Sequence, residues 1–489
     1  MESVQLTLLL LVFLVFVILM FLRKIPALLA LPLLAFFIPL ISGVNIVDIF
    51  TFVLGNGATR LSEAYTIAIF GSMLSIMMQK TGVAESFIKT GAELSGDKPW
   101  AISLVMLLLI ILLFTTLGGL GAIIMVSTVV LPILASVGVG PVTTTGIFLT
   151  GLSIGGILNV GNWAVYTQVL KLQVDEVQSF ALIMFVLMFV IAVVYITIQL
   201  YKDGHDINFM KIATYLIGIV AIGFLIWFGY GQIPVAVSGY LDKIFSYIPM
   251  ILKYVVGAGI GFLVLLSLIR LFKNEEDGKV SFTAYFIPVI PLFLILVFGI
   301  NFIAAFIAGL IYGFISTYRK ASLNILIRSI LDGGAVVMPA VALMLGIGML
   351  LNAVMGPPAA LMESFKEGWP VLLLLKPVLV AIKPESAMGY VILFSLAAPL
   401  ALYRGPLNVW GMGYGIAAIF LAGGMPAGAI MGLLMAVGQI QGISDPTNTQ
   451  NVWLANEMKI DVQKILWNTL PYTWIAAIIG LVVAAMIFY

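Results

Sequence analysis

The sequence contains no cysteine, only one histidine and few charged side chains, and each shortage excludes a class of protein. Without cysteine there is no disulfide framework, no thiolate metal site and no cysteine nucleophile. His205 stands in the polar segment KDGHD, where we expect a solvated loop residue and not a catalytic base or a metal ligand. No GxxxxGK[ST] run occurs, which argues against a nucleotide-driven pump. We therefore predict a protein that is not an enzyme and has no bound cofactor.

Charged residues make up 9% of the chain and hydrophobic residues 62%, and the mean hydropathy is +1.20. A water-soluble protein cannot bury so much apolar surface, so we predict a multi-pass protein of the inner (plasma) membrane, with the lipid bilayer as its main partner. The net charge of +2 gives no reason to expect a nucleic-acid partner. Several apolar runs approach the ~20 residues that a helix needs to cross the hydrocarbon. They are 5–22, 100–117, 179–200, 249–269 and 465–488.

The number of spans and their orientation are less sharply defined by the sequence. We expect roughly ten to thirteen spans, because some Gly- and Pro-broken segments are too short for a full crossing. Residues 3–20 have no basic segment before them and no small-residue cleavage site, so we interpret them as a retained first span and not as a signal peptide. The segment 317–328 carries three basic residues and no acid, which favours the cytoplasmic side.

An internal repeat relates the two halves of the chain. With Asn162 placed on Asn448, a shift of 286 residues, the stretch 145–177 aligns with 431–463 without a gap. A chance match of common Gly and Ile residues is the alternative, but both copies end in a polar cluster, which chance does not predict. Identical pairs at this shift include Gly146 with Gly432, Ile154 with Ile440, Gly156 with Gly442 and Asp175 with Asp461.

The repeat predicts an all-α integral membrane protein, specifically an inverted-repeat secondary transporter with broken helices and re-entrant hairpins. Each half would contain a long helix, an amphipathic connector, a Gly-rich broken region and a short apolar segment that ends in polar residues. We expect scaffold helices in 1–50, the first repeat in 51–202, scaffold or connecting helices in 203–324 and the second repeat in 325–489.

The polar clusters at 157–163 and 444–451 are the predicted halves of one substrate and ion site. Gly161 gives the first cluster backbone freedom, and Pro446 opposes helix continuation in the second. Inside hydrocarbon, a broken helix survives only where protein or a wet cavity satisfies its backbone. Freed carbonyls can then hold a cation, while amides and hydroxyls bind a carboxylate. The predicted substrate-binding residues are Asn162, Thr447, Asn448, Thr449 and Arg404, and the predicted ion-binding residues are Asp445, Asn159, Gly161 and Asn451.

Each of these interpretations has a plainer alternative. The string Ser-Asp-Pro-Thr-Asn is also ordinary turn chemistry for a loop outside the membrane. Asp445 could bind Na⁺ or carry a proton, or it could cap the helical segment that starts near Thr447. Arg404 could pair with a carboxylate substrate, or it could cap a helix or extend to the membrane interface.

The order of motifs resembles the ion transporter superfamily, especially its gluconate and citrate permease branch. The resemblance rests on GATRLSEAYTIAIFGSMLSIMMQKTGVAESFIKTGAEL and the following broken Gly-rich segment with Pro132. Thr447-Asn448-Thr449 is similar to the Ser-Asn-Thr signature of divalent-anion/sodium symporters, which implies contact with a substrate carboxylate and with sodium. The likeness covers roughly 25–200 and 325–489 as pattern and not as strong identity, and the first cluster, Asn-Val-Gly-Asn-Trp, lacks that signature. The resemblance also implies a homodimer held together by scaffold helices.

The sequence therefore predicts a secondary active transporter that moves a small organic anion, a carboxylate, by elevator-like alternating access coupled to Na⁺ or H⁺. A Na⁺/H⁺ antiporter with Asp445 as the exchanging carboxylate is the alternative. The organic-anion interpretation is favoured because the clusters are rich in neutral amides and hydroxyls, whereas an antiporter would place more carboxylates at mid-membrane.

Overall fold

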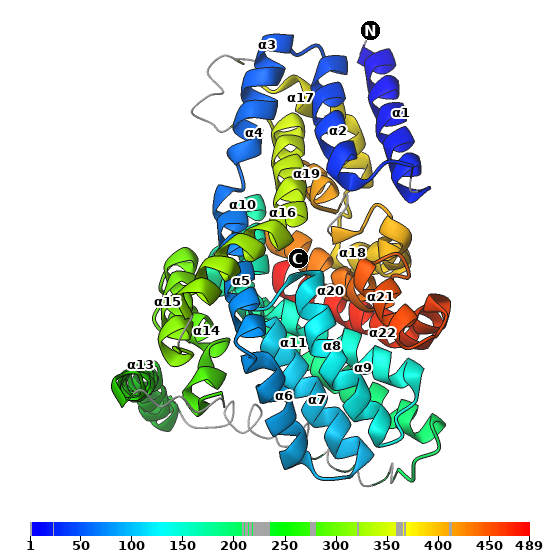
Figure 1. Ribbon diagram of the computed structural model, residues 1–489. Coiled ribbons are helices and arrows are strands. Elements are labelled where there is room, and N and C mark those ends of the chain that lie inside the picture. The colour runs from blue at the N-terminus through cyan, green and yellow to red at the C-terminus, as the bar shows by residue number, and fades with distance from the viewer. Residues whose placement is uncertain are drawn as a thin grey trace.

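The structure is a computed structural model that describes residues 2–22, 24–207, 235–273, 280–319, 322–357, 368–409 and 413–489, with residues 210, 214, 218 and 365. Within these residues it contains helices and no strand (Figure 1). Nine helices in this part of the chain are long and apolar enough to cross a membrane, or up to ten if the bent pair α9 (Pro141–Ile157) and α10 (Val160–Leu170) is one span. The predicted all-α membrane fold is confirmed.

The first half of the chain forms an ordered series of helices. It begins with α1 (Glu2–Phe21) and α2 (Ala27–Ile41), followed by a long bent helix made of α3 (Ile46–Asp48), the π-helix η1 (Ile49–Gly55), α4 (Asn56–Thr59) and α5 (Ser62–Lys80). The amphipathic connector is α6 (Val83–Ser95), and a break separates the next two helices, α7 (Pro99–Phe114) and α8 (Gly119–Ser136). The bent pair α9–α10 and the long helix α11 (Val174–Lys202) complete this half.

The second half repeats this order. It comprises α15 (Phe302–Ser316), α16 (Ser322–Met355), α17 (Pro370–Ile382), α18 (Ala387–Ala397), the 3-10 segment η4 (Ala398–Arg404), α19 (Tyr414–Ala422), α20 (Ala427–Ser444), α21 (Thr449–Glu457) and α22 (Val462–Phe488). Between the halves lie α13 (Val235–Lys273), the 3-10 turn η2 (Phe282–Phe286) and α14 (Val289–Leu296).

Helix boundaries follow the 286-residue shift found in the sequence. Pro141, the first residue of α9, falls on Ala427, the first residue of α20. Lys202, the last residue of α11, falls on Phe488, the last residue of α22. The broken hairpins α9–α10 and α20–α21 are therefore equivalent elements, as the repeat predicted.

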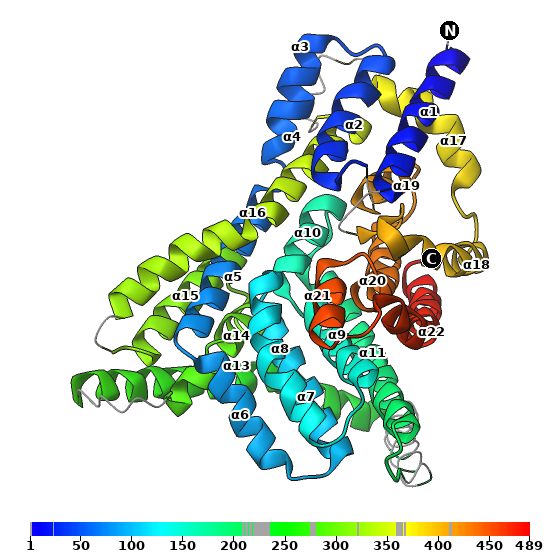
Figure 2. The ribbon, with the colours of Figure 1, turned by 45° about the vertical axis from the view of Figure 1, so that its right-hand side comes forward.

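The long helices α5 and α16 pack side by side and antiparallel, as an inverted repeat requires (Figure 2). Lys80, at the end of α5, forms an ion pair of 2.8 Å with Asp332, near the start of α16. Towards the other end of α16, a Cβ on Gly57 of α4, the short helix before α5, would lie 2.7 Å from the Met349 Cα, which is closer than real side chains approach. Glycine therefore permits the backbones of α4 and α16 to touch.

The helices of the two halves join in one packed unit beside this helix pair. α9, α11, α20 and α22 all contact one another. Both broken regions contain left-handed backbone: Gly119 has φ +82° at the α7–α8 break, whereas Tyr403 and Arg404 have φ +54° and +57° at the end of η4. Such angles are costly for a residue with a side chain, so the turn at the end of η4 needs stabilising contacts. The predicted domain boundaries remain predictions, and Lys320 and residues 208–234, apart from 210, 214 and 218, lie outside the described residues.

Candidate functional site

Side-chain N–H groups of the two polar clusters donate to the carbonyl groups at the ends of α9 and α20. In the first cluster, Asn162 Nδ2 donates to the Gly156 carbonyl at 2.8 Å, and Trp163 Nε1 donates to the Ile157 carbonyl at 2.7 Å. A helix end leaves such carbonyls without an internal partner, so these bonds stabilise the break. In the second cluster, the side-chain amide nitrogens of Asn448 and Asn451 donate to the carbonyls of Gln441 and Ile443.

Asn159 and Asp445 occupy equivalent positions at the 286-residue shift, and both make the same local turn. The Asn159 Oδ1 accepts from the Gly161 N–H at 2.9 Å, and the Asp445 Oδ1 accepts from the Thr447 N–H at 2.9 Å. Asn and Asp favour this side-chain-to-backbone turn. The two breaks therefore share one geometry although one residue is neutral and the other acidic.

Asp445 is fully buried and is surrounded by hydrogen-bond donors. Besides the Thr447 N–H, it accepts from the Tyr403 N–H at 3.0 Å and the Arg404 N–H at 3.4 Å. The Thr447 hydroxyl and the Asn408 amide complete the set at 2.8 and 3.5 Å. The carboxylate thus holds the left-handed turn at the end of η4, and a cation would have to displace donors to reach it. The helix cap at α21 is Asn448, not Asp445.

A cavity of about 160 Å³, here called the central pocket, lies between the two broken hairpins. Ser153 of α9 and Gln439 of α20 meet in its wall, where the Ser153 hydroxyl donates to Gln439 Oε1 at 2.8 Å. These residues are 286 apart, so they are equivalent in the two repeats. Equivalent residues contact each other only beside a two-fold axis, and the central pocket therefore lies at the pseudo-two-fold axis.

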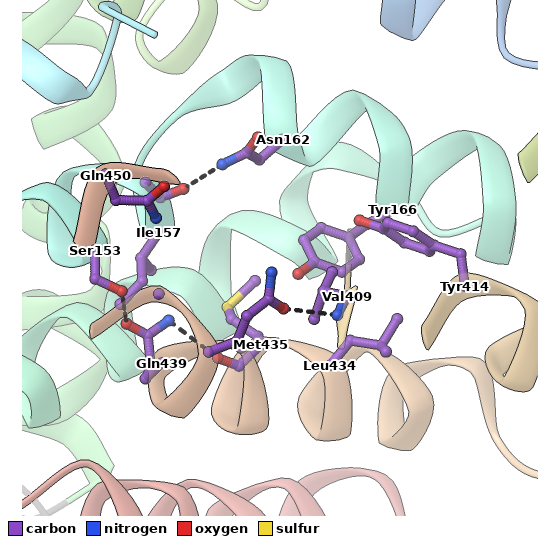
Figure 3. A pocket seen from close by; sticks show the side chains of 14 residues that line it. Ser153, Ile157, Asn162, Tyr166, Val409, Tyr414, Leu434, Met435, Gln439 and Gln450 are labelled. Carbon is purple, nitrogen blue, oxygen red and sulfur yellow. Dashed lines mark hydrogen bonds between the residues drawn. The ribbon is translucent and has the colours of Figure 1, made fainter. Parts of the chain in front are cut away.

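Amide side chains from both repeats face the central pocket. Gln441 Oε1 accepts from the Val409 N–H at 2.7 Å, whereas within the described residues neither the Gln441 amide nitrogen nor the Gln450 side chain is hydrogen-bonded. Figure 3 shows Ser153, Gln439 and Gln450 towards one end of the pocket. The rings of Tyr166 and Tyr414, with centroids 6.1 Å apart, lie at the other end. None of the lining residues is charged.

Of the predicted substrate-binding residues, the structure brings only Asn162 to the central pocket. Thr447 is buried beside Asp445, and Thr449 and the Arg404 side chain are exposed. Asn448 contacts Gln441 from outside the cavity. The sequence interpretation missed Ser153, Gln439, Gln441 and Gln450. Their signal was present, because polar side chains inside an apolar helix are costly and mark functional positions.

A second cavity, of about 210 Å³ and here called the scaffold pocket, lies between the first polar cluster and helices α5 and α16. It is lined by the predicted ion-binding residues Asn159 and Gly161, and Asn162 lines both cavities. Thr116 and Leu117, at the α7–α8 break, also line it. No hydrogen bond within the described residues reaches their carbonyl oxygens, so these oxygens are free to coordinate a cation.

Asn451 is the predicted ion-binding residue with the most unusual environment. It is fully buried, and its Oδ1 is one of the few buried side-chain atoms in the described part of the chain without a hydrogen-bond partner. A buried acceptor is normally satisfied, and a cation is one partner that would satisfy it. The ion-binding role of Asn451 nevertheless stays a prediction.

Comparisons with known proteins identify the fold. No protein-family model matches the sequence, and no curated protein does. The crystal structure of the YdaH transporter of Alcanivorax borkumensis matches over 90% of this chain and 88% of that chain, with a TM-score of 0.52 and 13% identity. The fold is that of a membrane transporter. MtrF of Neisseria gonorrhoeae, described as belonging to a class of antimetabolite efflux pumps, matches over 90% and 84% of the two chains, with a TM-score of 0.48 and 12% identity.

The match to YdaH shows a fold shared with a transporter but not the finer family assignment. That protein is not described as a gluconate or citrate permease, so that branch is not confirmed. The roles of individual residues therefore rest on the geometry of this chain.

Proposed function

We propose that the protein is a secondary active transporter that binds a small organic anion, a carboxylate, in the central pocket. The observation that carries the proposal is that both broken hairpins place the first turn of a half-helix there: Asn162 belongs to α10 and Gln450 to α21. Helix N-termini favour negative charge, and free amide groups donate to carboxylate oxygens. A transporter site between inverted repeats is expected to combine these features.

The substrate class can be tested on detergent-purified protein. A ligand present at 100 times its Kd stabilises a folded protein by about 2.7 kcal/mol, so a thermal-shift screen of mono-, di- and tricarboxylates should reveal the preferred anion. Neutral amides of the same size serve as the control. Stabilisation by the amides and not by any carboxylate would contradict the anion assignment.

Sodium is the coupling ion that the polar contacts favour. The scaffold pocket combines the Asn159 side chain with the open carbonyls of Thr116 and Leu117, and such a set of neutral oxygens suits a metal cation better than a proton. Uptake into proteoliposomes should therefore require an inward Na⁺ gradient at fixed pH and should fall when choline replaces Na⁺. Undiminished uptake in choline, driven by a proton gradient, would assign the coupling to H⁺.

The alternative of Na⁺/H⁺ antiport through Asp445 has weaker support. Asp445 lines neither cavity, and its oxygens face donors that fix the turn at the end of η4. An exchanging carboxylate needs access to water from each side of the membrane in turn.

Alternating access would move the broken hairpins against the crossed helices α5 and α16. One polar junction joins the two parts: Gln168 of α10 donates to Glu63 of α5 at 3.0 Å and accepts from the Ala64 N–H at 3.4 Å. Elevator-like motion would break this junction and form it again in each cycle.

A homodimer is the proposed assembly, with α13, which lies between the two repeats, at its interface. The apolar window Met250–Arg270 of α13 is only 6% buried within one chain, which leaves a large face for a partner or for lipid. A mass measurement in mild detergent should give two chains per particle. A single chain at all protein concentrations would contradict the dimer.

A further inference from the structure

A third cavity, here called the apolar pocket, lies between α1 and the helices α17, α18 and α19, and has a volume of about 600 Å³. Its floor is closed, since Val354 is 1% exposed. Its rim is open, since Leu400 is 52% exposed and Leu10 and Leu393 are also exposed. The pocket therefore opens at the surface where α1 approaches α18 and η4.

The chemistry of the walls determines what can fill this pocket. No residue that lines it has a charged, hydroxyl or amide side chain. A buried water needs two to four polar partners, so water would not be held here. A cavity left empty would forfeit the dispersion contacts of its walls. A hydrocarbon occupant would restore these contacts without leaving a polar group unsatisfied.

The surroundings of the rim indicate where the hydrocarbon comes from. The apolar window of α1 is only 11% buried within the chain, so this helix presents its outer face to the bilayer. Lys376 of α17 is exposed and directly follows Leu375, which lines the pocket, in the sequence. It has no ion-pair partner within the described residues, and lysine binds phosphate groups. We propose that the apolar pocket binds one acyl chain of a membrane phospholipid whose phosphate group lies near Lys376.

A bound acyl chain would support the second broken hairpin. Leu400 and Leu407 line the pocket and flank the turn whose N–H groups, from Tyr403 and Arg404, hold Asp445. The same segment continues to Val409, whose N–H donates to Gln441 in the central pocket. Removal of the lipid should therefore loosen the wall of the central pocket as well.

The site can be tested by filling it. Ala397→Trp places a large side chain in the pocket, whereas Leu396→Trp, one residue earlier on α18 at a position 73% exposed, leaves the pocket unchanged. Native mass spectrometry of the full-length protein titrated with phosphatidylglycerol should show one lipid fewer retained by Ala397→Trp than by wild type and Leu396→Trp. Equal retention by all three proteins would overturn the proposal.

A second experiment does not depend on the folding of a variant. Wild-type protein in nanodiscs that contain a phospholipid with a diazirine in its acyl chain should, after illumination, be labelled most strongly on peptides of α18 and α19 that line the pocket. Labelling no stronger there than on the outer face of α11 would contradict the site. Crosslinks between two chains at these peptides would assign the pocket to a protein partner instead.

The headgroup is tested separately from the acyl chain. Lys376→Gln should weaken binding of phosphatidylglycerol about tenfold, the loss expected for one charged hydrogen bond. It should leave binding of a diacylglycerol with the same chains unchanged. An unchanged affinity for both would show that Lys376 does not hold the headgroup and would overturn that part of the proposal.

Discussion

Ser153 donates a hydrogen bond to Gln439, the residue that occupies its own position in the second repeat. The bond places the pseudo-two-fold axis in the wall of the central pocket, between the two broken hairpins. Both hairpins can therefore contribute equivalent groups to one ligand.

The contact between these two residues should stabilise the packing of the hairpins. Ser153→Ala and Gln439→Leu should each lower the free energy of unfolding by about 1–3 kcal/mol, because each leaves a polar partner unsatisfied. The double variant should lose less than the sum of the two, which thermal unfolding of all four proteins can measure. Additive losses would show that the bond does not join the repeats.

Gln441 should be a direct ligand of the substrate. Gln441→Leu removes the free amide nitrogen from the central pocket and should weaken binding of the preferred carboxylate by at least tenfold, measured by thermal shift or calorimetry. Gln463→Leu is a suitable control, because Gln463 contacts Tyr403 outside the pocket. If Gln441→Leu binds the carboxylate as tightly as this control does, Gln441 has no role in recognition.

Asp445 should stabilise the folded protein and should not be the group that couples transport to the ion. In Asp445→Asn an amide NH₂ would face the Arg404 N–H and the Asn408 amide, which are donors, so the free energy of unfolding should fall by about 1–3 kcal/mol. Sodium dependence of uptake should remain in the fraction that folds. Loss of sodium dependence with unchanged thermal stability would identify Asp445 as the coupling group after all.

Asn159 should set the affinity for sodium. Asn159→Ala removes a side-chain oxygen that lines the scaffold pocket, and the Na⁺ concentration for half-maximal uptake should rise about tenfold. Asn456→Ala, on the exposed side of α21, should leave it unchanged. The same shift in both variants would mean that the scaffold pocket is not the sodium site.

The junction between Gln168 and Glu63 should report the motion of the hairpin. The chain has no cysteine, so a disulfide between Glu63→Cys and Gln168→Cys can form without competing thiols. Crosslinking should proceed in the absence of ligand and should slow when carboxylate and Na⁺ allow the hairpin to move. A crosslinked protein that still transports at the full rate would show that this junction never opens.

The order of the helices could be predicted from the sequence because the residues that form the helix breaks recur in both repeats. Helix boundaries recur at the 286-residue shift because the same turn-forming residues recur, such as Asn159 and Asp445 at the two breaks. Side-chain direction was harder to predict. Arg404 is exposed because its backbone turns left-handed at φ +57°, which no motif signals. Gln439 and Gln441 stand out in the sequence as polar residues in an apolar helix, but only the packing of α20 against α9 places them at the central pocket.

The central claim, that substrate binds between the two hairpins, is tested most directly by protection of one cysteine. Gln450→Cys would be the only thiol in the chain and would lie in the central pocket, whereas Asn456→Cys on the same helix would be exposed. The measurement is the rate of maleimide labelling with and without the carboxylate that gives the largest thermal shift. The account predicts at least tenfold slower labelling of Gln450→Cys with ligand and no change for Asn456→Cys. Equal labelling of Gln450→Cys with and without ligand would contradict it.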